Sequence, residues 1–239
     1  MQTETMTRFF DSFLSDPNEK ITIRFLKDRN KTGTNADASA GVIGTVAELT
    51  PLIAKRNASD WGAYFMVNHT GTTSTRDEDV KHARALFIDI DDAGCPEYFP
   101  LQPSATLRRS DGLGWHIYWF LSEPETDLEK WTTAQKALIH FYKSDTVIHN
   151  PARVMRIPGT VNHKDKYDAP HVYELDSCSG ERYTLDKVIF GHMDEEPRRK
   201  QARKQIKRLF NGEKMSDGEG RHSAFVKAAF ILNDYGFTG

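Results

Sequence analysis

Two carboxylates stand close together at the end of an apolar stretch in the middle of the chain. Residues 86–90 are aliphatic or aromatic except for Asp89, and Asp91 follows directly. This composition is typical of a buried strand, and side chains two positions apart on a strand point to the same face. Two like charges at that spacing repel unless a cation lies between them, so the pair predicts a divalent-cation site. An acidic turn after a strand, Asp-Asp-Ala-Gly, is the alternative interpretation.

A histidine lies on a second apolar stretch, just after a turn rich in glycine. His116 alternates with Trp115 and Ile117, which places it on the opposite face of a strand from both. A histidine in such a position is more often structural than functional, so its interpretation depends on the residues near it.

Cations and an amide flank a Pro-Gly turn further along the chain. Groups of this kind, held on a rigid turn, suit the oxygens of a phosphate chain. The alternative is a surface loop whose basic residues pair with nearby acids. The residues concerned are Arg153, Arg156, Asn162 and Lys164.

Asp145 lies between the histidine and the basic turn and is a candidate third carboxylate. Asp165 and Asp168 are near enough in the sequence to compete with it for this role. Nucleotidyl transfer by two metals needs several carboxylates to hold the cations, and basic groups to hold the triphosphate. All of these residue types occur here.

The elements that must position these residues follow from periodicity. Helical spacing predicts helices over 4–14, 127–142 and 185–190, and Thr50-Pro51 predicts the start of another. Strands are expected over 21–26, 62–68, 86–90, 105–109, 115–120 and 172–175, with residues 110–114 forming a hairpin turn. Helices and strands in this order predict a mixed α+β fold.

Composition limits the class of protein. With 38% hydrophobic and 28% charged residues among 239, the chain can bury a large core. The two cysteines have no CxxC spacing, which favours a reducing, cytoplasmic setting. No apolar run reaches membrane-spanning length, so no membrane partner is expected.

The composition changes from Glu195 onward. Seven of the eleven residues from 198 to 208 are Lys or Arg, which predicts a solvated linker helix or a nucleic-acid-binding arm. The arm residues are Arg198, Arg199, Lys200, Arg203 and Lys204. We expect a core over 1–192, a basic linker over 193–215 and the start of a helical domain over 216–239, cut short at Gly239.

Three motifs together resemble a known family. Phe87-Ile88-Asp89-Ile90-Asp91 is similar to the first motif of the archaeo-eukaryotic-type primases, in their phage and plasmid replication branch. Residues 110–116 are similar to the second motif, a small residue ahead of a histidine. Asp145 stands where the third-motif acid would fall, and 152–164 resembles an R-x-PGT-x-N-x-K segment of the phage and plasmid members.

The resemblance implies a core related to the RNA-recognition fold, with an extra α/β unit in front. It implies that two Mg²⁺ or Mn²⁺ ions are held by Asp89, Asp91 and Asp145, which would be the catalytic residues. The implied nucleotide-binding residues are Ser110, Gly112, His116, Arg153, Arg156, Asn162 and Lys164. The implied partners are single-stranded DNA, nucleoside triphosphates and a helicase or helicase domain following the chain, in a bacterial or archaeal host cell.

Two alternatives remain open from the sequence. A DxD-type glycosyltransferase would use Asp89 and Asp91 in the same way, on a nucleotide sugar, but gives no reason for His116 or the basic turn. A non-catalytic module that binds single-stranded nucleic acid would stack bases on aromatic residues and would need neither carboxylate.

Overall fold

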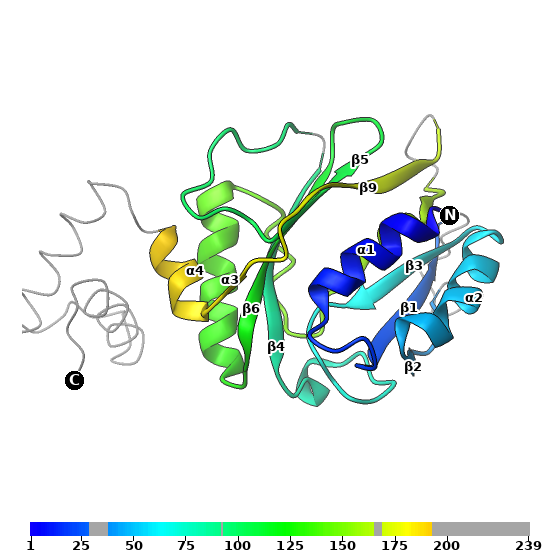
Figure 1. Cartoon of the computed structure of the whole chain (residues 1–239), viewed down its shortest axis with the longest axis horizontal. Coiled ribbons are helices and arrows are strands. Elements are labelled where there is room, and N and C mark those ends of the chain that lie inside the picture. Colours follow the sequence, from blue (N-terminus) through cyan, green and yellow to red (C-terminus); the bar gives the residue numbers. More distant parts are fainter. Residues whose placement is uncertain (29–37, 92, 165–168, 193–239) are drawn as a thin grey trace, which may run out of the picture.

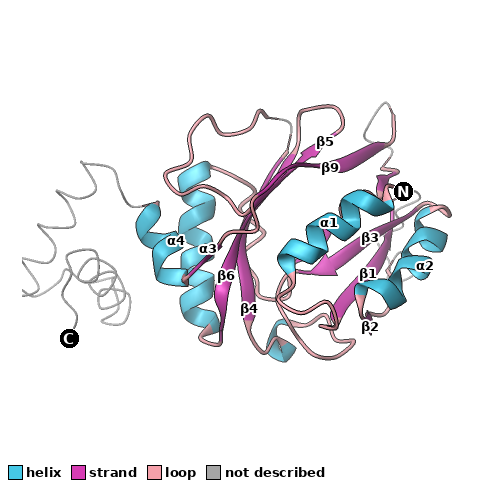
Figure 2. Cartoon of the chain, viewed as in Figure 1, coloured by secondary structure: helices cyan, strands magenta, loops and turns pink. Residues whose placement is uncertain are grey.

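The computed structural model describes residues 1–28, 38–91, 93–164 and 169–192. Its helices are α1 (Thr3–Phe13), α2 (Val46–Asn57), the short 3-10 helix η2 (Asp77–Asp79), α3 (Leu128–Tyr142) and α4 (Leu185–Gly191). Its strands are β1 (Ile21–Lys27), β2 (Val42–Gly44), β3 (Trp61–Met66), β4 (Ala83–Ile90), β5 (Ala105–Arg109), β6 (Trp115–Glu125), β7 (Val154–Arg156), β8 (Val161–Asn162), β9 (His171–Cys178) and β10 (Arg182–Tyr183). The class is mixed α+β, as predicted (Figure 2).

The strands form two sheets. The smaller has the order β2-β1-β3-β7, and the larger has the order β10-β6-β5-β9-β8 with β4 paired to β6. Figure 1 shows α3 and α4 on one side of β4 and β6, and α1 on the other side, next to the smaller sheet. The inner face of the larger sheet therefore looks toward α1 and the smaller sheet.

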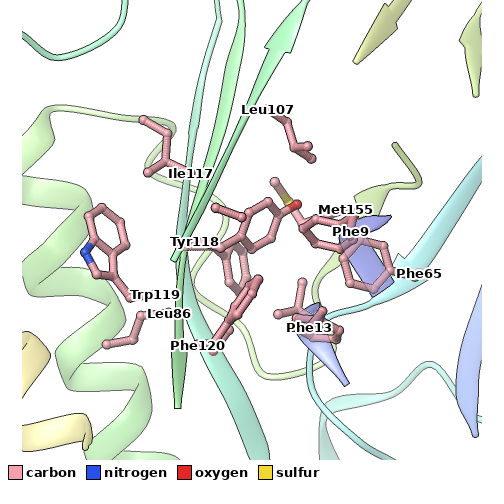
Figure 3. Close-up of a cluster of buried hydrophobic side chains, with 14 of the residues drawn as sticks. Phe9, Phe13, Phe65, Leu86, Leu107, Ile117, Tyr118, Trp119, Phe120 and Met155 are labelled. Carbon is pink, nitrogen blue, oxygen red and sulfur yellow. The ribbon is translucent and has the colours of Figure 1, made fainter. Parts of the chain in front are cut away.

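Aromatic side chains fill the space between the two sheets. The four apolar residues of α1 at helical spacing, Met6, Phe9, Phe10 and Phe13, are all buried. The ring of Phe9 lies 5.7 Å from that of Phe65 on β3 and 5.3 Å from that of Tyr118 on β6. Edge-to-face contacts of this kind add to the free energy gained from burial. This cluster joins α1 and both sheets into one core (Figure 3).

The outer edge of β4 is covered by side chains from α3. Gln135 accepts a hydrogen bond from the backbone N–H of Phe87 at 3.1 Å and donates to its carbonyl at 2.6 Å. The indole N–H of Trp131 donates to the carbonyl of Ala85 at 2.9 Å. These bonds satisfy backbone groups that an edge strand would otherwise leave open, and they fix β4, which carries Asp89.

The start of α2 differs from the prediction. The helix begins at Val46, after Thr45, and Pro51 lies inside it. Thr45 and Glu48 form a capping box: the Thr45 side chain accepts from the Glu48 N–H, and the Glu48 carboxylate accepts from the Thr45 N–H. Two backbone donors at the helix end are thereby satisfied, which favours this start over one at Thr50-Pro51.

The other predicted elements are observed, with shifts at their ends. The helices over 4–14, 127–142 and 185–190 correspond to α1, α3 and α4, and the hairpin over 105–120 to β5 and β6. The predicted linker and helical segment over 193–239 lie outside the described residues. Among the described residues, no helix is both long and apolar enough to cross a membrane.

Candidate active site

Asp89 and His116 are direct partners across two antiparallel strands. Asp89 on β4 pairs with His116 on β6, so their side chains lie on the same face. The His116 Nε2 atom is 3.6 Å from Asp89 Oδ1, which is longer than a hydrogen bond. On β6, Trp115, Ile117 and Trp119 alternate with His116 and lie on the other face, as the sequence predicted. The acid and the histidine therefore meet on the inner face of the larger sheet.

The imidazole of His116 is buried and held by an aromatic ring. It stacks on Tyr173 of β9, with 3.8 Å between ring centroids and 18° between ring planes. Burial and, after it, the positive charges of Arg156, Lys164 and Arg109 together lower the pKa of His116 to about 3. The ring is therefore neutral at pH 7, and its contact with Asp89 is not an ion pair.

Asp91 is paired with a buried arginine. The Arg109 side chain, 1% exposed, donates from Nη1 to Asp91 Oδ1 at 3.1 Å and from Nε to both oxygens of Asp111 at 2.8 and 2.9 Å. Burial alone would raise the pKa of Asp111, but hydrogen bonds from Arg109 and from the Leu113 N–H outweigh it and lower that pKa. A chain of alternating charges thus links Asp91 to the turn between β5 and β6.

The glycines and serine of that turn shape the backbone around Arg109. A Cβ atom on Gly114 would lie 3.0 Å from the Arg109 guanidinium, so the arginine needs a glycine there. Gly112 has a φ of 77° and open space around it, which is the left-handed conformation that glycine adopts at low cost. Ser110 is tied to β9, because its N–H donates to the Val172 carbonyl at 2.8 Å.

The backbone of Asp145 is hydrogen-bonded to that of Asp89. The Asp145 N–H donates to the Asp89 carbonyl at 3.0 Å, which brings the predicted third acid to the edge of β4. Its carboxylate accepts from the Val147 N–H at 3.0 Å, closing a local turn of the kind aspartate often stabilises. Its role as a metal ligand stays a prediction.

Arg156, predicted to bind phosphate, forms a buried ion pair. It donates to both carboxylate oxygens of Asp28, at 3.0 and 2.9 Å, and also to the Tyr64 hydroxyl group. Both side chains of the ion pair are almost completely buried. Burial lowers the pKa of Arg156, but Tyr64 and Asp28 outweigh it and raise that pKa above its ordinary value. Arg156 thus anchors the smaller sheet through Asp28, and its positive charge also lowers the pKa of His116.

The predicted Pro-Gly turn is observed and holds the segment that follows it. Thr160 donates to the Ile157 carbonyl at 3.3 Å across Pro158-Gly159, and Gly159 has a φ of 76°, as a type II turn requires. The Asn162 side chain is buried and accepts from the Lys164 N–H at 3.2 Å. The positive charge of Lys164 lowers the pKa of His116.

Arg153 turns toward a different neighbour. Its guanidinium donates to the Val147 carbonyl, in the loop that carries Asp145. The structure therefore joins Arg153 to the loop that carries Asp145. Arg156 and Lys164, by contrast, lower the pKa of His116.

The donor chemistry suits a hard cation at this place. Carboxylate oxygens are the ligands that Mg²⁺ and Mn²⁺ prefer, and Asp89 and Asp91 supply them from one face of β4 and its extension. Within the described residues, no three His, Cys, Asp or Glu side chains converge in a way that could hold a metal ion. The two carboxylates thus have the donor chemistry for such a cation, and their binding of one, like a third protein ligand, stays a prediction.

Comparisons with known proteins address the fold. No model of a protein family matches this chain, and no curated protein does. The AEP domain of the cyanophage S-2L primase-polymerase matches with a TM-score of 0.56 and 21% identity, over 79% of this chain and 96% of that one. The primase RepB' matches with a TM-score of 0.58 and 15% identity, over 88% of this chain and 68% of that one. The catalytic domain of RepB' in complex with initiator DNA matches with a TM-score of 0.54 and 16% identity, over 88% of this chain and 98% of that one.

The chain has the fold of an archaeo-eukaryotic-type primase catalytic domain. The resemblance predicted from the three motifs is therefore confirmed at the level of the fold. Asp89 and His116, on which two of the three motif resemblances rest, come from β4 and β6, which are adjacent strands of one sheet.

Several residues of the site were missed by the sequence analysis. Arg109 and Tyr173 lie on predicted strands, and alternation could have placed Arg109 on the His116 side but could not have paired it with Asp91. Asp28 is 128 positions from Arg156, and no local pattern indicated their contact. The predicted arm, Arg198, Arg199, Lys200, Arg203 and Lys204, lies outside the described residues.

Proposed function

We propose that this chain catalyses template-directed nucleotidyl transfer on single-stranded DNA, as a DNA primase, a DNA polymerase or both, in phage or plasmid replication. The observation that carries the proposal is the pairing of Asp89 with His116 across two adjacent strands, close to the positive charges of Arg109, Arg156 and Lys164, within a fold shared with primases.

Asp89 and Asp91 would hold the divalent cations, with Asp145 as the candidate third ligand. When bound, Mg²⁺ or Mn²⁺ would lower the pKa of the attacking hydroxyl group and neutralise charge on the phosphoryl group. Arg109 holds the Asp91 carboxylate through its hydrogen bond at 3.1 Å. A carboxylate held in this way loses less conformational freedom when it binds a cation.

His116 would contact the phosphates of the incoming nucleotide. Its ring is neutral, its orientation is fixed by Tyr173, and its Nδ1 atom is buried with no hydrogen-bond partner among the described residues. A neutral imidazole N–H can donate to a phosphate oxygen. Arg156, Lys164 and Arg109 would add positive potential around the triphosphate. Ser110, Gly112, Arg153 and Asn162 would complete the nucleotide-binding group.

In the reaction, the 3′ hydroxyl oxygen of the growing strand would attack the α-phosphorus of a nucleoside triphosphate. The new O–P bond would form as the bond to the β-phosphate breaks, and pyrophosphate would leave. The hydroxyl proton would pass to solvent. The protein contributes position and charge, which are the main terms in phosphoryl transfer.

Single-stranded DNA is the proposed template. One of the structural neighbours was solved in complex with initiator DNA, which supports a DNA-binding face in this fold. A helicase domain and a cytoplasmic location in the host belong to the same proposal. Deleting residues 198–208 would flatten the dependence of DNA affinity on salt if this stretch contacts phosphates, and would leave the slope unchanged if it is a linker.

The deciding experiment is a synthesis assay on single-stranded DNA with labelled nucleotides and Mg²⁺ or Mn²⁺. We expect metal-dependent product from the wild type and a loss of more than about 100-fold in Asp89→Asn/Asp91→Asn. The matched control is Glu123→Gln/Glu129→Gln, which changes two carboxylates that are exposed, and it should retain full synthesis. Equal synthesis by the aspartate variant would refute the site. A lane without primer separates a primase from a polymerase.

The two alternatives give different results in the same experiment. DNA binding without synthesis, unaffected by Asp89→Asn, would favour a non-catalytic binding module. A glycosyltransferase would give no product from nucleoside triphosphates and would hydrolyse or transfer a nucleotide sugar instead. That alternative accounts for Asp89 and Asp91 but not for the buried His116–Tyr173 stack.

A further inference from the structure

Tyr118 carries a buried hydroxyl group for which the described residues offer no hydrogen-bond partner. The residue lies on β6, two positions after His116, and none of its surface is exposed. A buried polar group without a partner destabilises a protein, and most such groups are paired. Tyr183, a second buried tyrosine of the same sheet, follows this rule by donating to the Gln102 carbonyl at 2.9 Å.

The strand register places this hydroxyl group on the side of the site. Tyr118 pairs with Phe87 and His116 pairs with Asp89, so Tyr118 and Asp89 are diagonal neighbours on one face of the β4–β6 pair. Diagonal neighbours are within reach of each other when one has a long aromatic side chain. Figure 3 shows Tyr118 projecting from β6 into the space between the sheets, toward Phe9 and Met155.

The ring of Tyr118 is fixed in this direction. Its centroid lies 5.3 Å from that of Phe9, 6.2 Å from Phe87, and 6.4 Å from both Phe65 and Phe120. A ring enclosed by four others cannot turn its hydroxyl group to bulk water. The partner of that group must therefore come from within the site.

The strand register indicates which acceptor is near, because Asp89 lies diagonal to Tyr118 on the same face. Burial raises the pKa of Tyr118 well above its ordinary value, and Asp89 and Tyr173 raise it further. A tyrosine hydroxyl group carries its proton at neutral pH and serves as a donor, and Asp89 provides a carboxylate acceptor.

We propose that Tyr118 is a positioning residue whose hydroxyl group donates a hydrogen bond to the Asp89 carboxylate through one water molecule, and so orients that carboxylate toward a divalent cation. This inference rests on the proposed function, because it assigns Asp89 to cation binding. It adds a residue that lies outside the three sequence motifs.

The test compares Tyr118→Phe with Tyr183→Phe as a matched control. For each protein, the Tm is measured without metal, the affinity for Mn²⁺ by electron paramagnetic resonance of the free ion, and synthesis as a function of Mn²⁺ concentration. For Tyr118→Phe we expect a lower Tm, because the buried hydrogen bond to Asp89 through water is lost, together with roughly 10-fold weaker Mn²⁺ binding, as for other residues that support a metal ligand. Tyr183→Phe should lower the Tm and leave both Mn²⁺ binding and synthesis unchanged.

A double-mutant cycle separates positioning from a general structural effect. In the Asp89→Asn background, Tyr118→Phe should have no further effect on Mn²⁺ binding, because the group through which it acts is gone. Unchanged Mn²⁺ affinity in Tyr118→Phe, or an equal loss in both backgrounds, would overturn the inference. If the wild type makes no product but Tyr118→Phe still weakens Mn²⁺ binding through Asp89, the proposed function fails and the positioning role stands.

Discussion

Replacing Asp28 by alanine should destabilise the protein more than most single substitutions. The Asp28 carboxylate accepts two hydrogen bonds from Arg156 and a third from the His163 N–H at 2.9 Å. Its side chain is 1% exposed and that of Arg156 is 3% exposed. Removing one partner leaves a buried, uncompensated charge, which costs about 3–5 kcal/mol. The Tyr64 hydroxyl group and the Val161 carbonyl remain as acceptors for Arg156, so we expect about 3 kcal/mol.

This loss is measured by urea unfolding followed by circular dichroism, with linear extrapolation to water. Because domains are stable by about 5–15 kcal/mol, the variant should still fold. The control is Glu78→Ala, which breaks a pair with Arg76 whose side chains are 64% and 71% exposed, and which should cause almost no change. A loss below about 1 kcal/mol in Asp28→Ala would refute the reasoning that this pair anchors the smaller sheet.

Two further predictions concern the site directly. Gly114→Ala places a Cβ atom 3.0 Å from the Arg109 guanidinium, so it should cost about 1–3 kcal/mol by overpacking and weaken Mn²⁺ binding; an unchanged Tm would contradict this. The pKa of His116 is about 3 in the folded protein and 6.5 in a free side chain, so between these values the unfolded chain binds the extra proton. Stability should therefore fall by up to about 1.4 kcal/mol per pH unit as the pH drops from 6.5 toward 3, and His116→Phe should flatten that slope in urea unfolding at several pH values.

The fold was predictable wherever local pattern and tertiary packing agree. The apolar spacing of α1 matches the side that faces the core, and the alternation in β6 matches its two buried faces. The start of α2 was predicted wrongly because Thr50-Pro51 is a strong local signal, whereas the Thr45–Glu48 capping box satisfies more backbone donors. The three-residue strand β2 was missed because so short a strand depends on its pairing with β1 rather than on its own residues.

The site was predictable in its residue types but not in its pairings. Asp89 and His116 could be assigned to faces by alternation, and the register of β4 and β6 then brings them together. The basic residues could not be sorted in the same way. Arg156 has its charge compensated by Asp28, far away in the sequence, while Arg109 was read as a strand residue and contacts Asp91. Both contacts depend on the order of the strands within a sheet, which no short motif encodes.

Removing divalent cations should leave the fold intact, because protein groups compensate the charges of the site. Asp91 pairs with Arg109, Arg109 also with Asp111, and the His116 ring is neutral at pH 7. A structural metal site, by contrast, supplies much of the folding free energy, and chelators unfold such proteins. We therefore expect the same Tm with and without EDTA, while Mn²⁺ raises it only as far as binding to the folded state requires. A large fall in Tm on adding EDTA would show that the cation holds these carboxylates together, and that Arg109 does not.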